Sequence, residues 1–178
     1  MNSLSRGLCI LHQGIGLHFT DIFSYNIFTV MNTTGLRNVD VEVQGTLKWN
    51  NDNIDYWLAN SLYIGFQNQT SAWFFGGHQV HFYGNGQGTI DGSGQVWYNY
   101  NNGRSNLHGR PHAITISDTK DSVIEGLRFI KSQMWTSTVI RSEQVLLQDI
   151  YVNNSCEPGA GTFGGCNLNT DGMYSNTN

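Results

Sequence analysis

The feature of this sequence that most restricts its fold is a repeat with a period of 23 residues. Shifting the segment SVIEGLRFIKS (122–132) by 23 positions aligns it with VLLQDIYVNNS (145–155). Apolar residues then meet apolar residues, in the pairs Val123–Leu146, Ile124–Leu147, Leu127–Ile150 and Phe129–Val152. A unit of this length cannot bury its apolar face alone, so neighbouring units are expected to stack. The repeat therefore predicts a solenoid built from short coils.

A second, looser pair of segments supports the same fold. RNVDVEVQGTL (37–47) aligns with HQVHFYGNGQGTI (78–90), and both end in a Gly-Thr-aliphatic turn. Runs rich in Val, Ile, Phe and Thr alternate with clusters of Gly, Asn and Asp, which indicates short strands between turns. The expected strands are 39–43, 79–83, 113–116, 123–129, 136–140 and 145–152. These features favour a parallel β-helix with Asn and Ser ladders at its corners, although a β-sandwich has similar strand spacing.

Composition excludes several other classes of protein. The chain has 178 residues, enough for one domain, with only 12% charged residues and 21 glycines. Disordered chains have high net charge and few aromatic residues, and helical bundles are rich in Ala, Glu, Lys and Leu. This chain has neither composition, so an all-β, turn-rich protein is expected. The net charge of −4 disfavours nucleic acid and anionic membranes as partners, and no apolar run is long enough to span a membrane.

Cysteines and glycosylation sequons give weak information about the compartment. Asn32, Asn68 and Asn153 each begin an Asn-x-Ser/Thr sequon, so they are candidate glycosylation sites. The three cysteines lack the spacing of metal ligands. Cys156 and Cys166 could close a small disulfide loop, but three reduced thiols are an equally good interpretation. The N-terminus does not contain a convincing signal peptide.

Several motifs occur in an order that is found in one enzyme family. They are GQGTIDGSGQVWY (86–98), GRPHAITI (109–116), DSVIEGLRFIKSQMWTSTV (121–139), EQVLLQDIYVNN (143–154) and LNTDG (168–172). In residues and order they resemble fungal polygalacturonases of glycoside hydrolase family 28. The segments 30–49 and 54–77 are most similar to the exo-acting members. The resemblance covers about residues 27–172, so we divide the chain into a poorly matching segment, 1–26, and the coils of one β-helix domain, 27–178.

The resemblance implies a fold and an activity. The fold is a right-handed parallel β-helix, and the reaction is hydrolysis of α-1,4-galacturonosyl links in pectin with inversion, most similar here to exo-acting enzymes. It also implies an extracellular protein that binds pectic polysaccharide and needs no cofactor or metal, and we expect a monomer. Alternatives are exo-hydrolysis of rhamnogalacturonan or xylogalacturonan, and a non-catalytic carbohydrate-binding β-helix. A pectate lyase is disfavoured, because no acidic cluster for calcium is visible.

Site residues follow from the same resemblance. Asp171, in the Asn-Thr-Asp motif, is the expected carboxylate that helps activate the attacking water, and Asn169 would hold the turn or contact the sugar. Trp135 is a candidate for stacking on a sugar ring. The family's Asp-Asp, Gly-His-Gly and Arg-x-Lys motifs do not follow Asp171 here. We therefore expect an N-terminal fragment or a mispredicted gene product of a larger protein, with an incomplete catalytic site and an incomplete C-terminal end.

Other residues have ambiguous roles. His108, Arg110 and His112 could bind a metal or anion, but Pro111 favours an extended turn that leads into a strand. Asp91 and Asp118 are expected to cap backbone N–H groups in turns. A set of aromatic residues could line a wall that closes one end of a substrate-binding groove, or could pack under a long loop. The set comprises Tyr56, Trp57, Trp73, Phe74 and Phe75, with Asp55 beside them. A stack cut between coils exposes its apolar end, so the isolated chain is expected to be poorly soluble.

Overall fold

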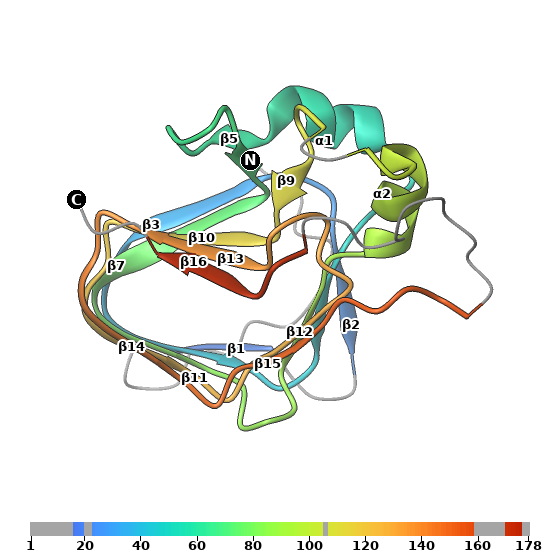
Figure 1. Ribbon diagram of the computed structural model, residues 1–178. Helices are drawn as coiled ribbons and strands as arrows, with labels where there is room; N and C mark the ends of the chain where they lie inside the picture. The colour runs from blue at the N-terminus through green and yellow to red at the C-terminus, as the bar shows by residue number, and fades with distance from the viewer. Residues whose placement is uncertain (1–15, 20–22, 105–106, 159–169, 176–178) are drawn as a thin grey trace.

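The chain winds into successive coils that stack along one axis. The computed structural model describes residues 16–19, 23–104, 107–158 and 170–175. In Figure 1 the coils lie one behind another, and each strand lies beside the matching strand of the next coil. All described strand pairs are parallel except β5 with β6 (Leu62–Tyr63 and Thr70–Ser71). The predicted parallel β-helix is confirmed, and the β-sandwich alternative is wrong because its sheets are antiparallel.

Two large sheets and one small sheet make up the coils. The first sheet contains β1 (Gly16–Phe19), β3 (Met31–Val43), β7 (Trp73–Tyr83), β10 (Ile114–Ser117), β11 (Lys120–Glu125), β13 (Ser137–Ile140), β14 (Glu143–Gln148) and β16 (Met173–Ser175). The second contains β2 (Ser24–Ile27), β4 (Thr46–Trp49), β8 (Thr89–Asp91), β12 (Arg128–Ile130) and β15 (Tyr151–Asn153). The small sheet joins β5, β6 and β9 (Pro111–His112). β1 lies before residue 27 and β2 ends at Ile27, and the domain division at that residue stays a prediction.

Two insertions leave the coils on the same side. The first, between β4 and β7, carries α1 (Ile54–Asn60), β5 and β6; the second, between β8 and β10, carries α2 (Gly94–Asn101) and β9. In Figure 1, α1, β5 and β9 lie above the upper part of the first sheet, and α2 lies to the right of it. The side chain of Asn53 caps α1 by accepting a hydrogen bond from the backbone N–H of Tyr56 at 3.1 Å. Because of these insertions, equivalent residues of the early coils lie more than 23 positions apart in the sequence.

Strand register confirms both alignments made from the sequence. Lys120 pairs with Glu143, Ile124 with Leu147 and Phe129 with Val152, each 23 residues apart. The looser alignment is also confirmed, by pairs such as Arg37–His78, Val39–Val80 and Val41–Phe82. Segments 123–129 and 145–152, expected as single strands, are each divided into two by a turn. Gly126 and Asp149 adopt positive φ angles at these turns, and the chain there passes from the first large sheet to the second.

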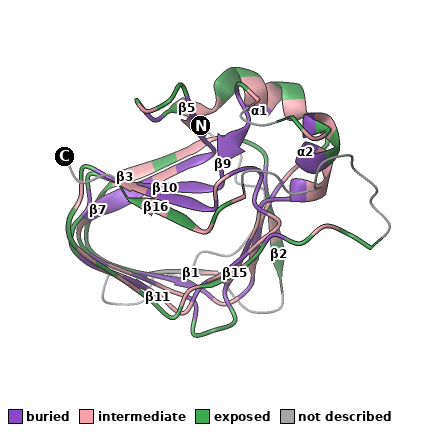
Figure 2. Cartoon of the chain, in the orientation of Figure 1, coloured by how far each residue is buried: buried purple, intermediate pink, exposed green. Residues whose placement is uncertain are grey.

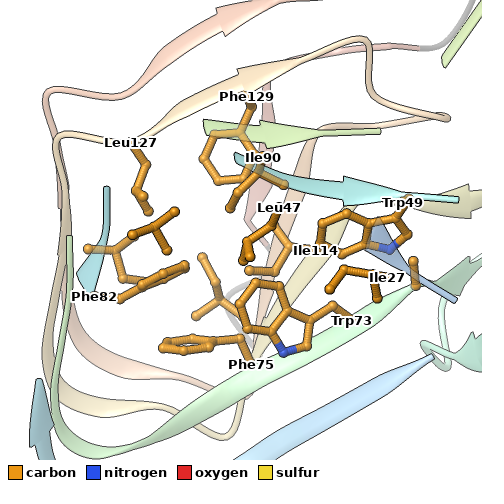
Figure 3. Close-up of a cluster of buried hydrophobic side chains, with 14 of the residues drawn as sticks. Ile27, Leu47, Trp49, Trp73, Phe75, Phe82, Ile90, Ile114, Leu127 and Phe129 are labelled. Carbon is orange, nitrogen blue, oxygen red and sulfur yellow. The ribbon is translucent and has the colours of Figure 1, made fainter. Parts of the chain in front are cut away.

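The core lies inside the coils, between the two large sheets. Figure 3 shows its apolar side chains, which point inward from both sheets; labelled members are Ile27, Leu47, Trp49, Trp73, Phe75, Phe82, Ile90, Ile114, Leu127 and Phe129. Phe75 and Phe82 are stacked with ring centroids 4.4 Å apart. Figure 2 shows buried residues concentrated on the inward side of the coils. Burial of each large apolar side chain contributes about 1.5–3 kcal/mol, so the stacked core is the main stabilising feature.

Candidate active site

Asp171 and Trp135 occupy equivalent positions in successive coils, just before β16 and β13. The backbone N–H of Thr136 donates to the carbonyl of Asp171 at 2.8 Å, and that of Ala113 donates to the carbonyl of Trp135 at 3.2 Å. This pattern continues the parallel register of β10, β13 and β16 into the preceding turns. His112 occupies the same position one coil below Trp135. The structure thus aligns Asp171, Trp135 and His112 in one column along the helix axis.

Asp171 is exposed at the end of this column that belongs to the last described coil. Its backbone is held by the coil below, because Thr136 and Ser137 donate to the carbonyls of Asp171 and Gly172. Asn169 lies outside the described residues, so its role stays a prediction. Asp171 is therefore an exposed carboxylate on a turn whose backbone is hydrogen-bonded to the neighbouring coil.

Asn154 fixes the turn that carries Asp171, a role that the motif search did not identify. Its Nδ2 donates to the carbonyl of Thr170 at 2.7 Å and to Thr136 Oγ1 at 2.9 Å. Its Oδ1 accepts from the backbone N–H of Ser132 at 2.8 Å. The side chain is buried, so these bonds are shielded from water. The expected Asn ladder at a coil corner was the only sequence signal for this residue.

Four rings form a continuous aromatic row that includes the two rings of the column. The row consists of His112, Trp135, Tyr174 and Phe66. Neighbouring ring centroids in this order are each 5.1 Å apart, with interplanar angles of 35°, 37° and 22°. Trp135 is half-buried within the row, and Tyr174 and Phe66 are also partly exposed. The row therefore brings the predicted residue Trp135 next to two aromatic rings, Tyr174 and Phe66, that the sequence did not single out.

Buried polar groups support the lower end of the row. His112 Nδ1 and Thr138 Oγ1 share a hydrogen bond of 2.6 Å, and neither side chain is exposed to solvent. Burial, and then the charge of Arg110, lower the pKa of His112 to about 3. The imidazole is consequently neutral at ordinary pH. Arg110 is also buried, which lowers its pKa to about 10 against the opposing effect of Tyr98.

The interpretation of residues 108–112 as an extended turn is confirmed, because Pro111 and His112 form β9 and lead into β10. Arg110 donates from Nε to the carbonyl of Gln133, and His112 bonds to Thr138, so both side chains face the protein interior. Within the described residues, no group of three or more His, Cys, Asp or Glu side chains is arranged to hold a metal ion. In that same part of the chain, no helix is both long and apolar enough to cross a membrane.

The two aspartates predicted to cap turns behave differently. Asp91 accepts a hydrogen bond from the backbone N–H of Ser93 at 2.8 Å, so its prediction is confirmed. The prediction for Asp118 is wrong, since its carboxylate accepts from Arg141 Nε at 2.9 Å and from Nη2 at 3.0 Å. These hydrogen bonds lower the pKa of Asp118. The two partners lie 23 residues apart and so face each other in successive coils.

Three of the five aromatic residues considered for a wall are buried inside the molecule, whereas Tyr56 and Phe74 are half-buried. Trp57 is buried, and its indole N–H donates to the carbonyl of Asn50 at 2.8 Å. Trp73 and Phe75 belong to the core, and Tyr56 accepts a hydrogen bond from the backbone N–H of Val30. The packing interpretation is therefore the better one for these residues, and the ring near Asp171 that belongs to the insertion is Phe66.

The three sequon asparagines are all exposed. Asn32 accepts from the N–H and the hydroxyl of Thr34, whereas the Nδ2 atoms of Asn68 and Asn153 contact His108 and the Tyr151 hydroxyl. Glycosylation at these positions stays a prediction. Cys156 is disulfide-bonded, but Cys166 lies outside the described residues, so the pairing of these two cysteines also stays a prediction.

Comparison with known protein sequences identifies similar proteins. The family model described as glycosyl hydrolases family 28 matches residues 27–177. The chain is 46% identical over 149 residues to the alpha-L-rhamnosidase rgxB of Aspergillus niger, covering 84% of this chain and 33% of that protein. It is 38% identical over 149 residues to exopolygalacturonase X of Aspergillus niger, covering 82% and 33%. The chain thus spans about a third of the length of these curated relatives.

A solved structure gives a similar result for the fold. The endo-xylogalacturonan hydrolase from Aspergillus tubingensis matches with a TM-score of 0.70 and 20% sequence identity. The match covers 91% of this chain and 40% of that chain. At this level of identity the likeness concerns the fold alone, and it agrees with the stacked parallel coils described above.

Proposed function

The chain belongs to family 28 of the glycosyl hydrolases, and from that membership we propose that it provides part of the active site of an exo-acting hydrolase of α-1,4-linked galacturonan in pectin. The observation that carries the proposal is the exposed carboxylate of Asp171 above Trp135 in one column. A pectic substrate and an extracellular location follow from the same membership. The three exposed sequon asparagines are compatible with that location.

In an inverting hydrolase, one carboxylate activates water while a carboxylic acid protonates the leaving oxygen from the other side of the bond. These two groups lie roughly 6.5–9.5 Å apart, which leaves room for the water. We assign Asp171 to the water side because it stands at the family's Asn-Thr-Asp motif, and Asn154 holds its turn in place through the carbonyl of Thr170. Trp135 lies one coil below Asp171, where its ring packs against Tyr174 and can offer only its exposed edge to a sugar.

Exo action, the removal of sugars from a chain end, is supported by the complete burial of the residues on the sheet below Asp171. His112, Thr115 and Thr138 have 0% of their surface exposed, so no sugar ring fits over them. Thr115 and Thr138 are paired in β10 and β13, the strands that lead up to Asp171 in the stack. A polysaccharide that approaches Asp171 therefore cannot continue along the coils in this direction. A groove closed on one side accepts a chain end, which is the requirement for removing terminal sugars.

A second candidate differs in the terminal sugar. The alpha-L-rhamnosidase of Aspergillus niger is more similar in sequence to this chain, at 46% identity, than exopolygalacturonase X, at 38%. That difference favours testing a rhamnose-terminated substrate beside a galacturonate-terminated one. Both substrates place a pyranose ring at the cleaved bond, so Asp171 has the same role in either reaction.

The test is incubation of the purified chain with oligogalacturonides and, separately, with an aryl α-L-rhamnoside, following released monosaccharide. Where the chain alone releases monosaccharide, Asp171→Asn should lower the rate by about 10²–10⁴, because the amide cannot accept a proton from water. Asp149→Asn is the matched control, since Asp149 is exposed at a turn with positive φ that asparagine tolerates well. Its rate should equal that of the unmodified chain.

Each outcome has a distinct meaning. Monosaccharide release that requires Asp171 supports hydrolysis, and the preferred substrate identifies the terminal sugar. Release that persists in Asp171→Asn contradicts the role of this carboxylate. A folded chain that binds oligosaccharide without cleaving it contradicts hydrolysis by this chain and supports a carbohydrate-binding role.

A further inference from the structure

A short loop of the first insertion reaches over the coils to the candidate active site. This loop, residues 64–69 between β5 and β6, is called the strap below. Its base is closed by a hydrogen bond from the N–H of Ile64 to the carbonyl of Gln69 at 3.0 Å. Ile64 and Gln69 are buried, while the tip, with positive φ at Gly65, Gln67 and Asn68, turns sharply. The strap therefore presents Phe66 from an anchored base.

Phe66 contacts a ring that is distant in the sequence. It stacks on Tyr174 of β16 with a centroid distance of 5.1 Å and an interplanar angle of 22°. The insertion that carries the strap ends at β7, and β10 and β13 separate β7 from β16 in the sheet. The strap thus extends along the axis of the coils to the level of Asp171. In Figure 1 the β5 region lies above the upper sheet, on the side of β9.

The order of the aromatic row makes Phe66 its accessible end. Trp135 and Tyr174 each contact two rings of the row, and the opposite end, His112, is completely buried. Tyr174 therefore has Trp135 beside it on one side and Phe66 on the other. A sugar ring can pack against Tyr174 only if the Phe66 ring is absent or displaced, because an aromatic face accepts one partner at van der Waals distance.

We propose that Phe66 is a specificity-determining residue that sets how far a saccharide extends past Asp171 towards the earlier coils. The proposal rests on the proposed function, because it assumes that the saccharide binds beside Asp171. The Phe66 ring occupies the place of one further pyranose on Tyr174. Removing the ring opens that place, whose other walls, Tyr174 and Trp135, remain.

The test compares the binding of a galacturonate dimer and hexamer to the purified chain by isothermal titration calorimetry. Phe66→Ala should raise the hexamer-to-dimer affinity ratio about fivefold, since one more sugar ring then stacks on Tyr174. Phe66→Tyr keeps an aromatic ring on the strap, so its ratio should equal that of the unmodified chain. Phe28→Ala is the matched control, because Phe28 is an exposed phenylalanine outside the row, and it should also leave the ratio unchanged.

The outcomes separate this proposal from the proposed function. An unchanged ratio in a folded Phe66→Ala variant overturns the role of Phe66 while leaving the binding of oligosaccharide by the unmodified chain intact. A fall in affinity for both ligands also overturns it, because Phe66 would then hold the sugar instead of excluding it. Absence of oligosaccharide binding by the unmodified chain and by every variant contradicts the proposed function together with this proposal.

Discussion

At the scale of single residues, two buried polar side chains organise the surroundings of Asp171. Asn154 bonds to Ser132, Thr136 and Thr170, and so ties the turn before β16 to the coil below it. His112 bonds to Thr138 and contacts the ring of Trp135. Burial of a polar group costs free energy unless the group is hydrogen-bonded. The side chains of Asn154 and His112 therefore keep their bonding partners in place. Neither side chain needs to touch substrate to affect the site.

Protonation of His112 should reduce stability in acid. Its folded-state pKa of about 3 lies below the ordinary value of 6.5, so the unfolded chain binds the extra proton between these pH values. The free energy of unfolding should therefore fall as pH decreases from about 6.5 towards 3, by up to about 1.4 kcal/mol per pH unit, and should not depend on this group above 6.5.

Urea unfolding at several pH values checks this expectation. His112→Gln cannot take up the proton, so its stability should change less with pH in this window than that of the unmodified chain. His108→Gln, at an exposed histidine, is the control and should retain the original slope. Equal slopes for the unmodified chain and His112→Gln would contradict a neutral buried imidazole.

At the scale of elements, the coils depend on close contact at their corners. Gly77 in β7 pairs with Leu36 in β3, where the register of the two strands shifts. Its φ of +147° is unfavourable for other residues, and a Cβ at this position would overlap the carbonyl of Leu36. The added Cβ and the carbonyl oxygen of Leu36 both belong to, or are bonded directly to, the backbone. Neither atom can move away unless the backbone of its coil shifts. The corner therefore requires glycine for steric as well as conformational reasons.

Gly77→Ala should lower the free energy of unfolding by about 3 kcal/mol, since it combines backbone strain with overpacking. Gly35→Ala is the matched control at the same corner, because a Cβ there has no atom within 4 Å. Its effect should stay within about 0.5 kcal/mol. Denaturant midpoints at constant m-value give the comparison, and similar losses for both variants would disprove a specific steric requirement at Gly77.

At the scale of the whole molecule, the described stack has an open edge. Among the described strands, β14 pairs only with β11, and β15 only with β12. Leu146 and Tyr151 lie in these two strands and are 50% and 44% exposed, and Met173 of β16 is 49% exposed. Unpaired strand edges with exposed apolar side chains readily pair with other chains. The isolated chain is therefore expected to associate through this end.

Sedimentation velocity across roughly 1–100 µM should show association of the unmodified chain that increases with concentration. Leu146→Lys should reduce it, because a lysine on an edge strand resists pairing. Phe28→Lys changes an equally exposed apolar residue outside any strand, so it should have little effect. A monomer throughout this range, or equal effects of the two substitutions, would contradict association through β14.

The sequence by itself determined the coil architecture. Equal spacing of apolar residues requires equivalent residues to stack, so pairs such as Ile124–Leu147 could be identified before the structure was known. The tertiary structure alone decided which insertion reaches the site. Phe66 meets Tyr174 because the insertion that carries Phe66 lies beside a later coil in space. The local sequence pattern does not predict such a contact, because the contact depends on the path of the whole chain.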